Sequence, residues 1–482
     1  MNKPVMMQYF EWYLDCDCKL WKQVTKEAKH LKEVGIDSLW LPPAYKGSGG
    51  KWDVGYGAYD LYDLGEFDQK GSLETKYGSK EEYVLMAQEC HKVGLKIYVD
   101  MVLNHKMGAD ACELVPAIKV NRQHRNQVEE EHVMVQAWTR YDYVNRHQKY
   151  SAFTWNYHHF DGVDYDDQTH TNAIYRIYGK DWDQHVSKEL GNYDYLMGCD
   201  LDFQNEEVVA ELTRWACWYY DMIGYDGIRF DACKHIDSHF FAPFVEVIKQ
   251  KQPNLACVGE YWSDTISEQL QFLEDCHGCM RLFDVALHHH FRQASASNGY
   301  YDMRTIFKDT LTAINPDHSA PFVDNHDSQP NQALSSWVLE WFKVHAYSMI
   351  LLRKEGYPVI FYGDYYGVKK DGYAGYKTII DWLLQVRKQH MMGSSHDYFD
   401  DCDIVGWTFE GDDSHTGFAC ILTNACGGHK RMYIGKQYAN CILYDGLCNI
   451  QNGVCVDDQG MGDFVCKDGS VSVYLFEKNC QE

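Results

Sequence analysis

The chain has 482 residues, too many for one hydrophobic core, so we expect two or three domains. Apolar residues make up 45% and charged residues 24%, which is typical of a well-folded globular protein. The formal net charge of −25 makes nucleic acid and anionic membranes unfavourable partners, because an acidic surface repels both.

Short apolar segments alternate with helical patterns along most of the chain. The first helical patterns cover Leu20 to Val34 and Lys80 to Val93, and a later one covers Glu206 to Met222. Eight strands separated by helical segments predict a parallel α/β fold, closed as a (β/α)8 TIM barrel. The expected strands are 6–10, 38–42, 96–100, 227–231, 256–260, 281–284, 321–324 and 359–362.

Two segments depart from this rhythm. Residues 104–205 are polar and aromatic, rich in Asp and His, and poor in helical periodicity, which predicts a loop-rich domain inserted after the third strand. From residue 396 the pattern changes to alternating runs with Gly turns, which predicts a C-terminal antiparallel β-sandwich. The barrel would then comprise residues 1–103 and 206–395, and the C-terminal domain residues 396–482.

Polar clusters follow four of the expected strands, at the end where the active sites of barrels form. They lie at 100–105, 229–235, 260–262 and 324–327. One carboxylate at a strand end is weak support for a site. Four such strand ends that face the same depression of the barrel are hard to explain by structural needs alone.

Three acidic residues in these clusters fit the cleavage of a glycosidic bond, which needs carboxyl groups in different protonation states. Asp231 follows Arg229 by two residues, so both side chains share one face of the strand and the cation favours an ionised nucleophile. Glu260 follows an apolar run, and a poorly solvated carboxyl has a raised pKa, which suits a general acid. Asp327 can hold sugar hydroxyls.

These clusters, together with the motifs at 8–13, 53–60 and 191–197, resemble the α-amylase family of starch-acting glycoside hydrolases. The resemblance covers essentially the whole chain and is nearest to the chloride-independent bacterial liquefying and cytoplasmic members. It implies a retaining double displacement that cuts internal α-1,4 bonds of starch, glycogen or maltodextrins. Asp231 would be the nucleophile, Glu260 the acid/base and Asp327 the transition-state stabiliser. The implied substrate contacts are Tyr56, Asp100, His105, Arg229, Lys234, Trp262 and His326.

Acidic residues of the inserted segment are hard oxygen donors, the ligand type that Ca²⁺ takes. The resemblance assigns one structural calcium to Asn104, Asp194, Asp200 and the main chain of His235. It assigns a second calcium, with a sodium between the two, to Asp161, Asp183 and Asp202. Gln204 stands where those relatives carry a further carboxylate, which weakens the second assignment. Loop capping and Asx turns are the alternative role for these aspartates.

Two rival functions remain: an α-glucan transglycosylase with the same three acids, and a non-catalytic glucan-binding relative, against which the intact acids argue. A buried structural ion pair is the alternative for Arg229 and Asp231, and ordinary packing is the alternative for the histidines and Tyr56. The N-terminus runs into a strand without a cleavable apolar segment, so we expect a cytoplasmic monomer, with secretion as the alternative. The 18 cysteines would then be free thiols.

Overall fold

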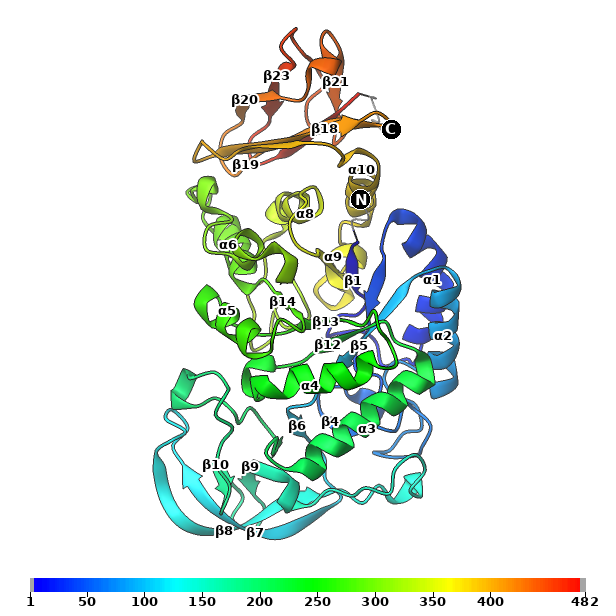
Figure 1. The fold of residues 1–482 in the computed structure, drawn as a ribbon, viewed down its shortest axis with the longest axis vertical. Coiled ribbons are helices and arrows are strands. Elements are labelled where there is room, and N and C mark those ends of the chain that lie inside the picture. The colour runs from blue at the N-terminus through cyan, green and yellow to red at the C-terminus, as the bar shows by residue number, and fades with distance from the viewer. Residues whose placement is uncertain (1–3, 477–482) are drawn as a thin grey trace. The chain divides into compact units, whose positions relative to one another are not determined.

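The computed structural model describes residues 4–476. Eight short strands form one sheet in the order β15-β14-β13-β12-β5-β2-β1-β16, and an isolated parallel bridge between Phe322 and Val359 helps to close it. The predicted (β/α)8 barrel is confirmed (Figure 1). The strands are β1 (Met6–Gln8), β2 (Ser38–Trp40), β5 (Lys96–Met101), β12 (Gly227–Phe230), β13 (Ala256–Gly259), β14 (Arg281–Phe283), β15 (Ser319–Ala320) and β16 (Val359–Phe361).

The helices that alternate with these strands follow the apolar periodicity closely, and the first one has the predicted bounds. Capping residues set their starts: Ser79 and Glu82 form a capping box at α2, and Asn205 accepts a hydrogen bond from Glu207 N at α3. The helices are α1 (Leu20–Val34), α2 (Lys80–Lys92), α3 (Glu206–Ile223), α4 (Ser238–Lys249), α5 (Ile266–Asp275), α6 (Val285–Ala296), α7 (Leu311–Ile314), α8 (Lys343–Leu351), α9 (Tyr362–Tyr366) and α10 (Lys377–His390). Within residues 4–476, no helix is both long and apolar enough to cross a membrane.

The seventh strand lies earlier than the expected 321–324, because β15 covers only Ser319–Ala320. Pro321 lacks the N–H that a strand ladder needs, although its carbonyl still accepts a hydrogen bond from Val359 N at 2.9 Å. Beyond Pro321 only the isolated bridge from Phe322 to Val359 continues the sheet among the described residues, and the chain then leads into the polar segment that contains Asp327.

Contacts divide the chain into two compact units. One holds the described residues up to Tyr13, Glu33–Asp37 and those from Asp284 on; the other holds Leu14–Lys32 and Ser38–Phe283. The second unit includes β5, β12 and β13, which pair in parallel with Arg229 opposite both Asp100 and Val258. This register brings the carboxyl ends of three strands together within one unit.

The inserted segment also belongs to the second unit, and it is richer in sheet than the loop-rich domain that we expected. It forms a six-stranded sheet in the order β6-β11-β9-β10-β7-β8. In the long β7–β8 hairpin Val115 and Val135 are buried whereas Leu114 and Met134 are exposed, so outward apolar residues hide the two-residue alternation. The strands are β6 (His105–Lys106), β7 (Ala111–Val120), β8 (Val128–Arg140), β9 (Phe160–Asp166), β10 (Thr171–Ile177) and β11 (Cys199–Leu201). A further two-stranded sheet pairs β3 (Lys46–Gly47) with β4 (Ala58–Asp60).

The C-terminal segment folds as the predicted antiparallel domain. A six-stranded sheet, β17-β18-β19-β24-β21-β22, and the β20-β23 pair share a core that includes Ile421, Met432, Phe464 and Tyr474. The strands are β17 (Ser395–Tyr398), β18 (Ile404–Asp412), β19 (His415–Thr423), β20 (Gly428–Tyr433), β21 (Ile442–Asp445), β22 (Val454–Cys455), β23 (Met461–Cys466) and β24 (Val471–Leu475).

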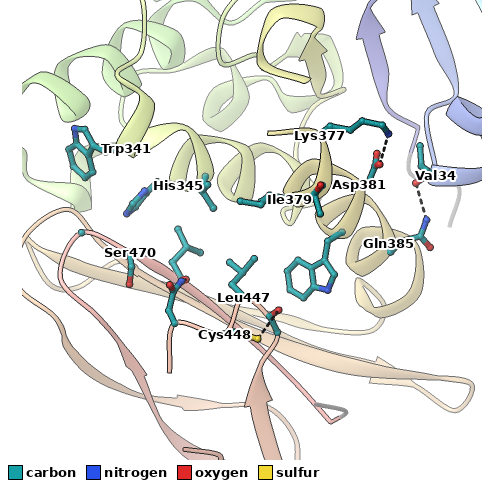
Figure 2. A pocket seen from close by; sticks show the side chains of 17 residues that line it. Val34, Trp341, His345, Lys377, Ile379, Asp381, Gln385, Leu447, Cys448 and Ser470 are labelled. Carbon is teal, nitrogen blue, oxygen red and sulfur yellow. Dashed lines mark hydrogen bonds and ion pairs between the residues drawn. The ribbon is translucent and has the colours of Figure 1, made fainter. Parts of the chain in front are cut away.

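A cavity of about 680 Å³ lies in the first of the two units, which contains the C-terminal domain. It is bounded by α8, α10 and loops of that domain (Figure 2). Its polar side chains are bonded to protein groups. Lys377 pairs with Asp381 at 2.7 Å, and Gln385 Nε2 donates to the carbonyl of Val34 at 3.3 Å. No predicted site residue lines this cavity, so the candidate active site has to be sought at the strand ends.

Candidate active site

Arg229 is the centre of the polar cluster at the carboxyl ends of β5, β12 and β13. Its side chain is fully buried, and Nη1 donates to Asp231 Oδ1 at 2.6 Å and to Asp100 Oδ1 at 2.9 Å. Nη2 donates to Glu260. One guanidinium thus holds the predicted nucleophile, the predicted acid/base and a third carboxylate together. Glu260 therefore has a cationic partner as well as the apolar surroundings that the sequence indicated.

Asp100 lies behind this cluster and is completely buried. Its Oδ2 accepts hydrogen bonds from Trp40 Nε1 at 2.9 Å and Tyr56 Oη at 2.8 Å. Burial raises the pKa of Asp100 to about 6, against the opposing effect of Arg229. Tyr56 thereby has a positioning contact in addition to its predicted role in binding substrate.

His105 joins the cluster through the main chain of Tyr56, whose carbonyl accepts a hydrogen bond from Nε2 at 2.9 Å. Burial lowers the pKa of His105 below its ordinary value, although the Tyr56 carbonyl opposes this shift. A neutral ring with one nitrogen fixed as a donor is suited to hydrogen bonding with sugar hydroxyls.

The backbone after Asp231 turns sharply. Ala232 has a φ of 49°, in the left-handed region that residues other than glycine rarely adopt. The turn is held because Cys233 N donates to the Glu260 carbonyl at 2.9 Å and Asp231 N donates to the Met101 carbonyl at 3.1 Å. The backbone segments that carry both acids are therefore bonded to each other and to the neighbouring strand.

Lys234 and Trp262, predicted to lie on the leaving-group side, are in contact. Lys234 Nζ donates to the Trp262 carbonyl at 3.2 Å and to Glu189 Oε2 at 2.9 Å. The main chain of Trp262 thus helps to orient Lys234. Glu189 comes from the inserted segment and was not predicted.

Two further predicted residues, His326 and Asp327, lie in the other compact unit. His326 Nδ1 accepts from Gln8 Nε2 at 3.0 Å, its Nε2 lies 3.3 Å from Asp327 Oδ2, and its ring stacks on Trp12. Because Gln8 donates to Nδ1, the proton of a neutral ring sits on Nε2, facing Asp327.

The acidic residues of the inserted segment form an inner cluster of Asp161, Asp194 and Asp200. All three are buried, and one carboxylate oxygen from each lies within 4.8 Å of the others. The pKa of Asp161 is raised well above its ordinary value, by burial and by repulsion from the other two. Such a cluster needs either protons or a cation to offset its charge.

Orphaned oxygens lie around the inner cluster. Asn104 Nδ2 donates to Asp200 Oδ1 at 2.9 Å, yet Asn104 Oδ1 receives no hydrogen bond from the described residues. The same holds for both oxygens of Asp161 and for Asp200 Oδ2. Buried oxygens without donors are typical of a cation site, so these residues fit a hard metal ion.

The other predicted metal ligands lie around this cluster with partners of their own. Asp183 N donates to Asp194 Oδ2 at 2.7 Å, and burial raises the pKa of the Asp183 carboxyl to about 7. His235 Nδ1 donates to the Tyr193 carbonyl at 2.6 Å. Asp202 forms an ion pair with Lys180, a residue that the sequence analysis did not single out.

The sequence analysis did not identify Trp40 and Gln8 as site residues, although the sequence around each contains a signal. Each places a hydrogen-bonding side chain in a buried strand, β2 and β1 respectively, where an apolar residue would pack without needing a partner. In the structure each orients a predicted site residue, Asp100 or His326.

The catalytic-domain model of the alpha-amylase family matches residues 20–400, most of the chain. The chain belongs to the alpha-amylase family. It is 47% identical over 478 residues to the alpha-amylase of Geobacillus stearothermophilus, covering 98% of this chain and 87% of that protein. It is 37% identical over 493 residues to the cytoplasmic alpha-amylase of Escherichia coli (strain K12), covering 99% of this chain and all of that protein.

Solved structures of this family share the fold. The acarbose complex of the alpha-amylase from Geobacillus thermoleovorans superposes with a TM-score of 0.64, covering 98% of each chain at 18% identity. The recognised family and the enzyme class, a glycoside hydrolase, are therefore confirmed.

Proposed function

We propose that this enzyme hydrolyses internal α-1,4 bonds of starch, glycogen or maltodextrins with retention of configuration. The observation that carries the proposal is the shared guanidinium of Arg229, which bonds both Asp231 and Glu260. Retaining glycosidases separate their two carboxyls by about 5–5.5 Å, and inverting enzymes by roughly 6.5–9.5 Å to admit a water molecule. Two acids on one guanidinium fit the shorter separation.

In this mechanism Asp231 attacks the anomeric carbon while Glu260 gives a proton to the departing glycosidic oxygen. Glu260 then takes a proton from water, which attacks the same carbon and frees Asp231. Arg229 cannot lose its charge at neutral pH, and its Nη1 holds the Asp231 carboxylate in place for attack. Asp327 is the third acid and stabilises the transition state through sugar hydroxyls.

The remaining predicted residues divide into two groups by role. Tyr56, Asp100, His105, Arg229 and His326 surround the sugar whose bond is cut, and Lys234 and Trp262 hold the leaving-group side. The bonds from Tyr56 and Arg229 to Asp100, and from Lys234 to Trp262, support these groupings.

A structural calcium fits the inner cluster, with Asn104, Asp194, Asp200 and the main chain of His235 as ligands. Its support is the set of buried oxygens without donors, among them Asn104 Oδ1 and Asp200 Oδ2. When bound, the ion supplies charge neutralisation and a crosslink. It would tie residues 104–205, our proposed inserted domain, to barrel residues 1–103 and 206–395, beside a C-terminal domain of residues 396–482.

We further propose a cytoplasmic monomer whose only macromolecular partner is its glucan. A relative named for the cytoplasm supports the location, and the net charge of −25 argues against nucleic acid and anionic membranes. Buried cysteines within residues 4–476, such as Cys90, Cys233 and Cys257, are free thiols in the structure. A thiol titration that found most cysteines oxidised in protein isolated from its host would contradict the cytoplasmic location.

Product analysis on amylose tests the function. Endo-hydrolysis predicts that viscosity falls well before reducing ends accumulate, and retention predicts that new ends first appear as α-anomers in proton NMR. The transglycosylase alternative predicts products longer than a maltooligosaccharide substrate. The non-catalytic alternative predicts glucan binding without any release of reducing sugar. First-formed β-anomers would contradict the proposed roles of the two acids.

A further inference from the structure

The segment that carries Asp327 leaves the barrel sheet before it reaches the site. β15 ends at Ala320, and the isolated bridge between Phe322 and Val359 is the last sheet pairing before Asp327 among the described residues. A strand ladder therefore does not fix the position of the Asp327 carboxylate. Its position depends on the side chains that hold residues 324–328.

Hydrogen bonds within residues 324–328 hold the main chain of Asp327. Asp327 N donates to Asn325 Oδ1 at 2.9 Å, and Asn325 N donates to Ser328 Oγ at 3.0 Å. The Ser328 hydroxyl donates to Asp324 Oδ1 at 2.6 Å. Asp324, Asn325 and Ser328 are all buried, so these polar groups depend on one another and not on bulk water. Within the segment, this series of hydrogen bonds ends at the Asp324 carboxylate.

Lys343, the first residue of α8, binds that carboxylate from outside the segment. Its Nζ lies 2.5 Å from Asp324 Oδ2 and 2.6 Å from Asp364 Oδ1, and none of the three side chains is exposed to solvent. Asp364 belongs to α9, which follows β16, and its Oδ2 accepts from Tyr347 Oη at 2.8 Å. All these residues lie in one compact unit. The ammonium thus joins the segments that follow the seventh and eighth strands of the barrel.

The place of this lysine is closely defined. Its Nζ lies 3.5 Å from the centre of the Trp337 ring, a cation–π contact in addition to the two ion pairs. Replacing a buried ion pair by packed apolar side chains is often neutral or stabilising, so stability alone is a weak reason for three buried charges. Their connection to the segment that carries Asp327 is a second reason.

We infer that Lys343 is a positioning residue, which acts through Asp324 and Ser328 to hold the backbone that directs the Asp327 carboxylate toward the sugar. This inference rests on the proposed role of Asp327 in stabilising the transition state. An interaction made chiefly in the transition state contributes to kcat more than to substrate binding. Loosening residues 324–328 should therefore lower kcat and change KM little.

Ser328→Ala tests the connection nearest to Asp327. It removes the hydroxyl that joins Asp324 to the segment and leaves every charge in place, so we expect kcat on maltooligosaccharides to fall about tenfold. The matched control is Ser472→Ala, since Ser472 is also buried and its hydroxyl donates to Asp445 Oδ2 at 3.0 Å in the C-terminal domain. The control should lose stability and keep its kcat. Native kcat in Ser328→Ala, or an equal loss in the control, would overturn the inference.

A double variant, Lys343→Met with Asp364→Asn, tests the lysine. It removes one buried charge of each sign, so it avoids the unpaired carboxylates that Lys343→Met alone would leave. We expect kcat to fall on the order of 10²-fold with KM nearly unchanged. The single variant Asp364→Asn keeps Lys343 paired with Asp324 and should retain a kcat near the native value. Native kcat in the double variant, or the same loss in Asp364→Asn alone, would overturn the role of Lys343.

Coupling to Asp327 distinguishes positioning from a purely structural role. The double variant and Ser328→Ala are also made in an Asp327→Asn background and assayed with a dinitrophenyl maltoside. If Lys343 and Ser328 act through Asp327, their replacement should cause little further loss of kcat in that background. Equal fold losses in both backgrounds would overturn the inference and leave the role of Asp327 standing. Native kcat in Asp327→Asn alone would overturn that role, and the inference with it.

Discussion

The guanidinium of Arg229 lies 2.6 Å from the carboxylate of Asp231, through Nη1 and Oδ1, at a position closed to solvent. The cost of burying an arginine is offset here by three carboxylates, each within hydrogen-bonding distance. The same arrangement serves the proposed chemistry, because one guanidinium holds both Asp231 and Glu260 in place. Stability and activity therefore depend on the same side chain.

Arg229→Lys should impair both. Lysine offers one ammonium on a flexible stem and cannot bond Asp231 and Glu260 through separate nitrogens. We expect kcat to fall on the order of 10²-fold from misplacement of the acids, and the unfolding free energy to fall by about 3–5 kcal/mol. Kinetics on maltooligosaccharides and urea unfolding measure the two effects.

The control is Arg387→Lys. Arg387 is also buried, and its Nη1 donates to the carbonyls of Leu351 and Arg353, which belong to no part of the proposed site. It should lose stability while kcat stays near the native value. Native kcat in Arg229→Lys would show that Arg229 is a structural residue alone.

Asp231→Asn and Glu260→Gln should separate the roles of the two acids. We expect Glu260→Gln to lose about 10²–10⁴-fold in kcat on amylose, and Asp231→Asn to lose on the order of 10⁴-fold or more. With a dinitrophenyl maltoside, whose leaving group needs no proton, Glu260→Gln should still release a rapid burst of dinitrophenol. Asp231→Asn should give none.

A matched control for this pair is Asp226→Asn, a carboxylate beside the opposite end of β12 that accepts from Ile97 N at 2.9 Å. It should leave kcat unchanged. A burst from Asp231→Asn, or its absence in Glu260→Gln, would reverse or reject the assignment.

Part of the cluster around Arg229 could be predicted from the sequence, because two of its members lie close together on one strand. Arg229 and Asp231 are two residues apart on one strand, so periodicity alone put them on the same face. The contact between Arg229 and Asp100 spans 129 residues and depends on the pairing of β5 with β12, which no single-strand pattern contains.

The inserted domain shows more clearly which features the sequence alone could not predict. Its aspartates could be identified as oxygen donors, but their partners Lys180, Gln204 and Asn104 reach them only in the folded chain. The β7–β8 hairpin was hidden because residues such as Leu114 and Met134 place apolar side chains on its solvent face.

The contributions of Asp100 and Asp110 to the free energy of unfolding should change with pH in opposite directions. Asp100 has a folded pKa of about 6, above its ordinary value, because it is buried. It favours the folded state most at low pH, and that contribution is lost as pH rises from about 4 through 6. The stability cost of Asp100→Asn should therefore be larger at pH 4 than at pH 7, by on the order of 2–3 kcal/mol.

Asp110 provides the comparison. Burial would raise its pKa, but hydrogen bonds from Tyr59 and from the N–H groups of Asp142 and Tyr143 lower it below its ordinary value. Its contribution is present at neutral pH and is lost as pH falls, so Asp110→Asn should cost more at pH 7 than at pH 4. Urea unfolding of both variants at the two pH values checks the signs. A cost with the same pH trend in both variants would contradict these environments.

Removal of calcium should lower the melting temperature, because an ion that binds only the folded lobe stabilises it by mass action. At free calcium near 1,000 times its dissociation constant the contribution is about 4 kcal/mol. Asp200→Asn should melt lower than the native enzyme with calcium present, and excess chelator should then have little further effect. Asp181→Asn removes a well-exposed carboxylate of the same lobe and should keep the full response to chelator. Differential scanning calorimetry measures all three proteins. An unchanged native melt in excess chelator would reject a structural calcium, whereas a full chelator response in Asp200→Asn would place the ion elsewhere.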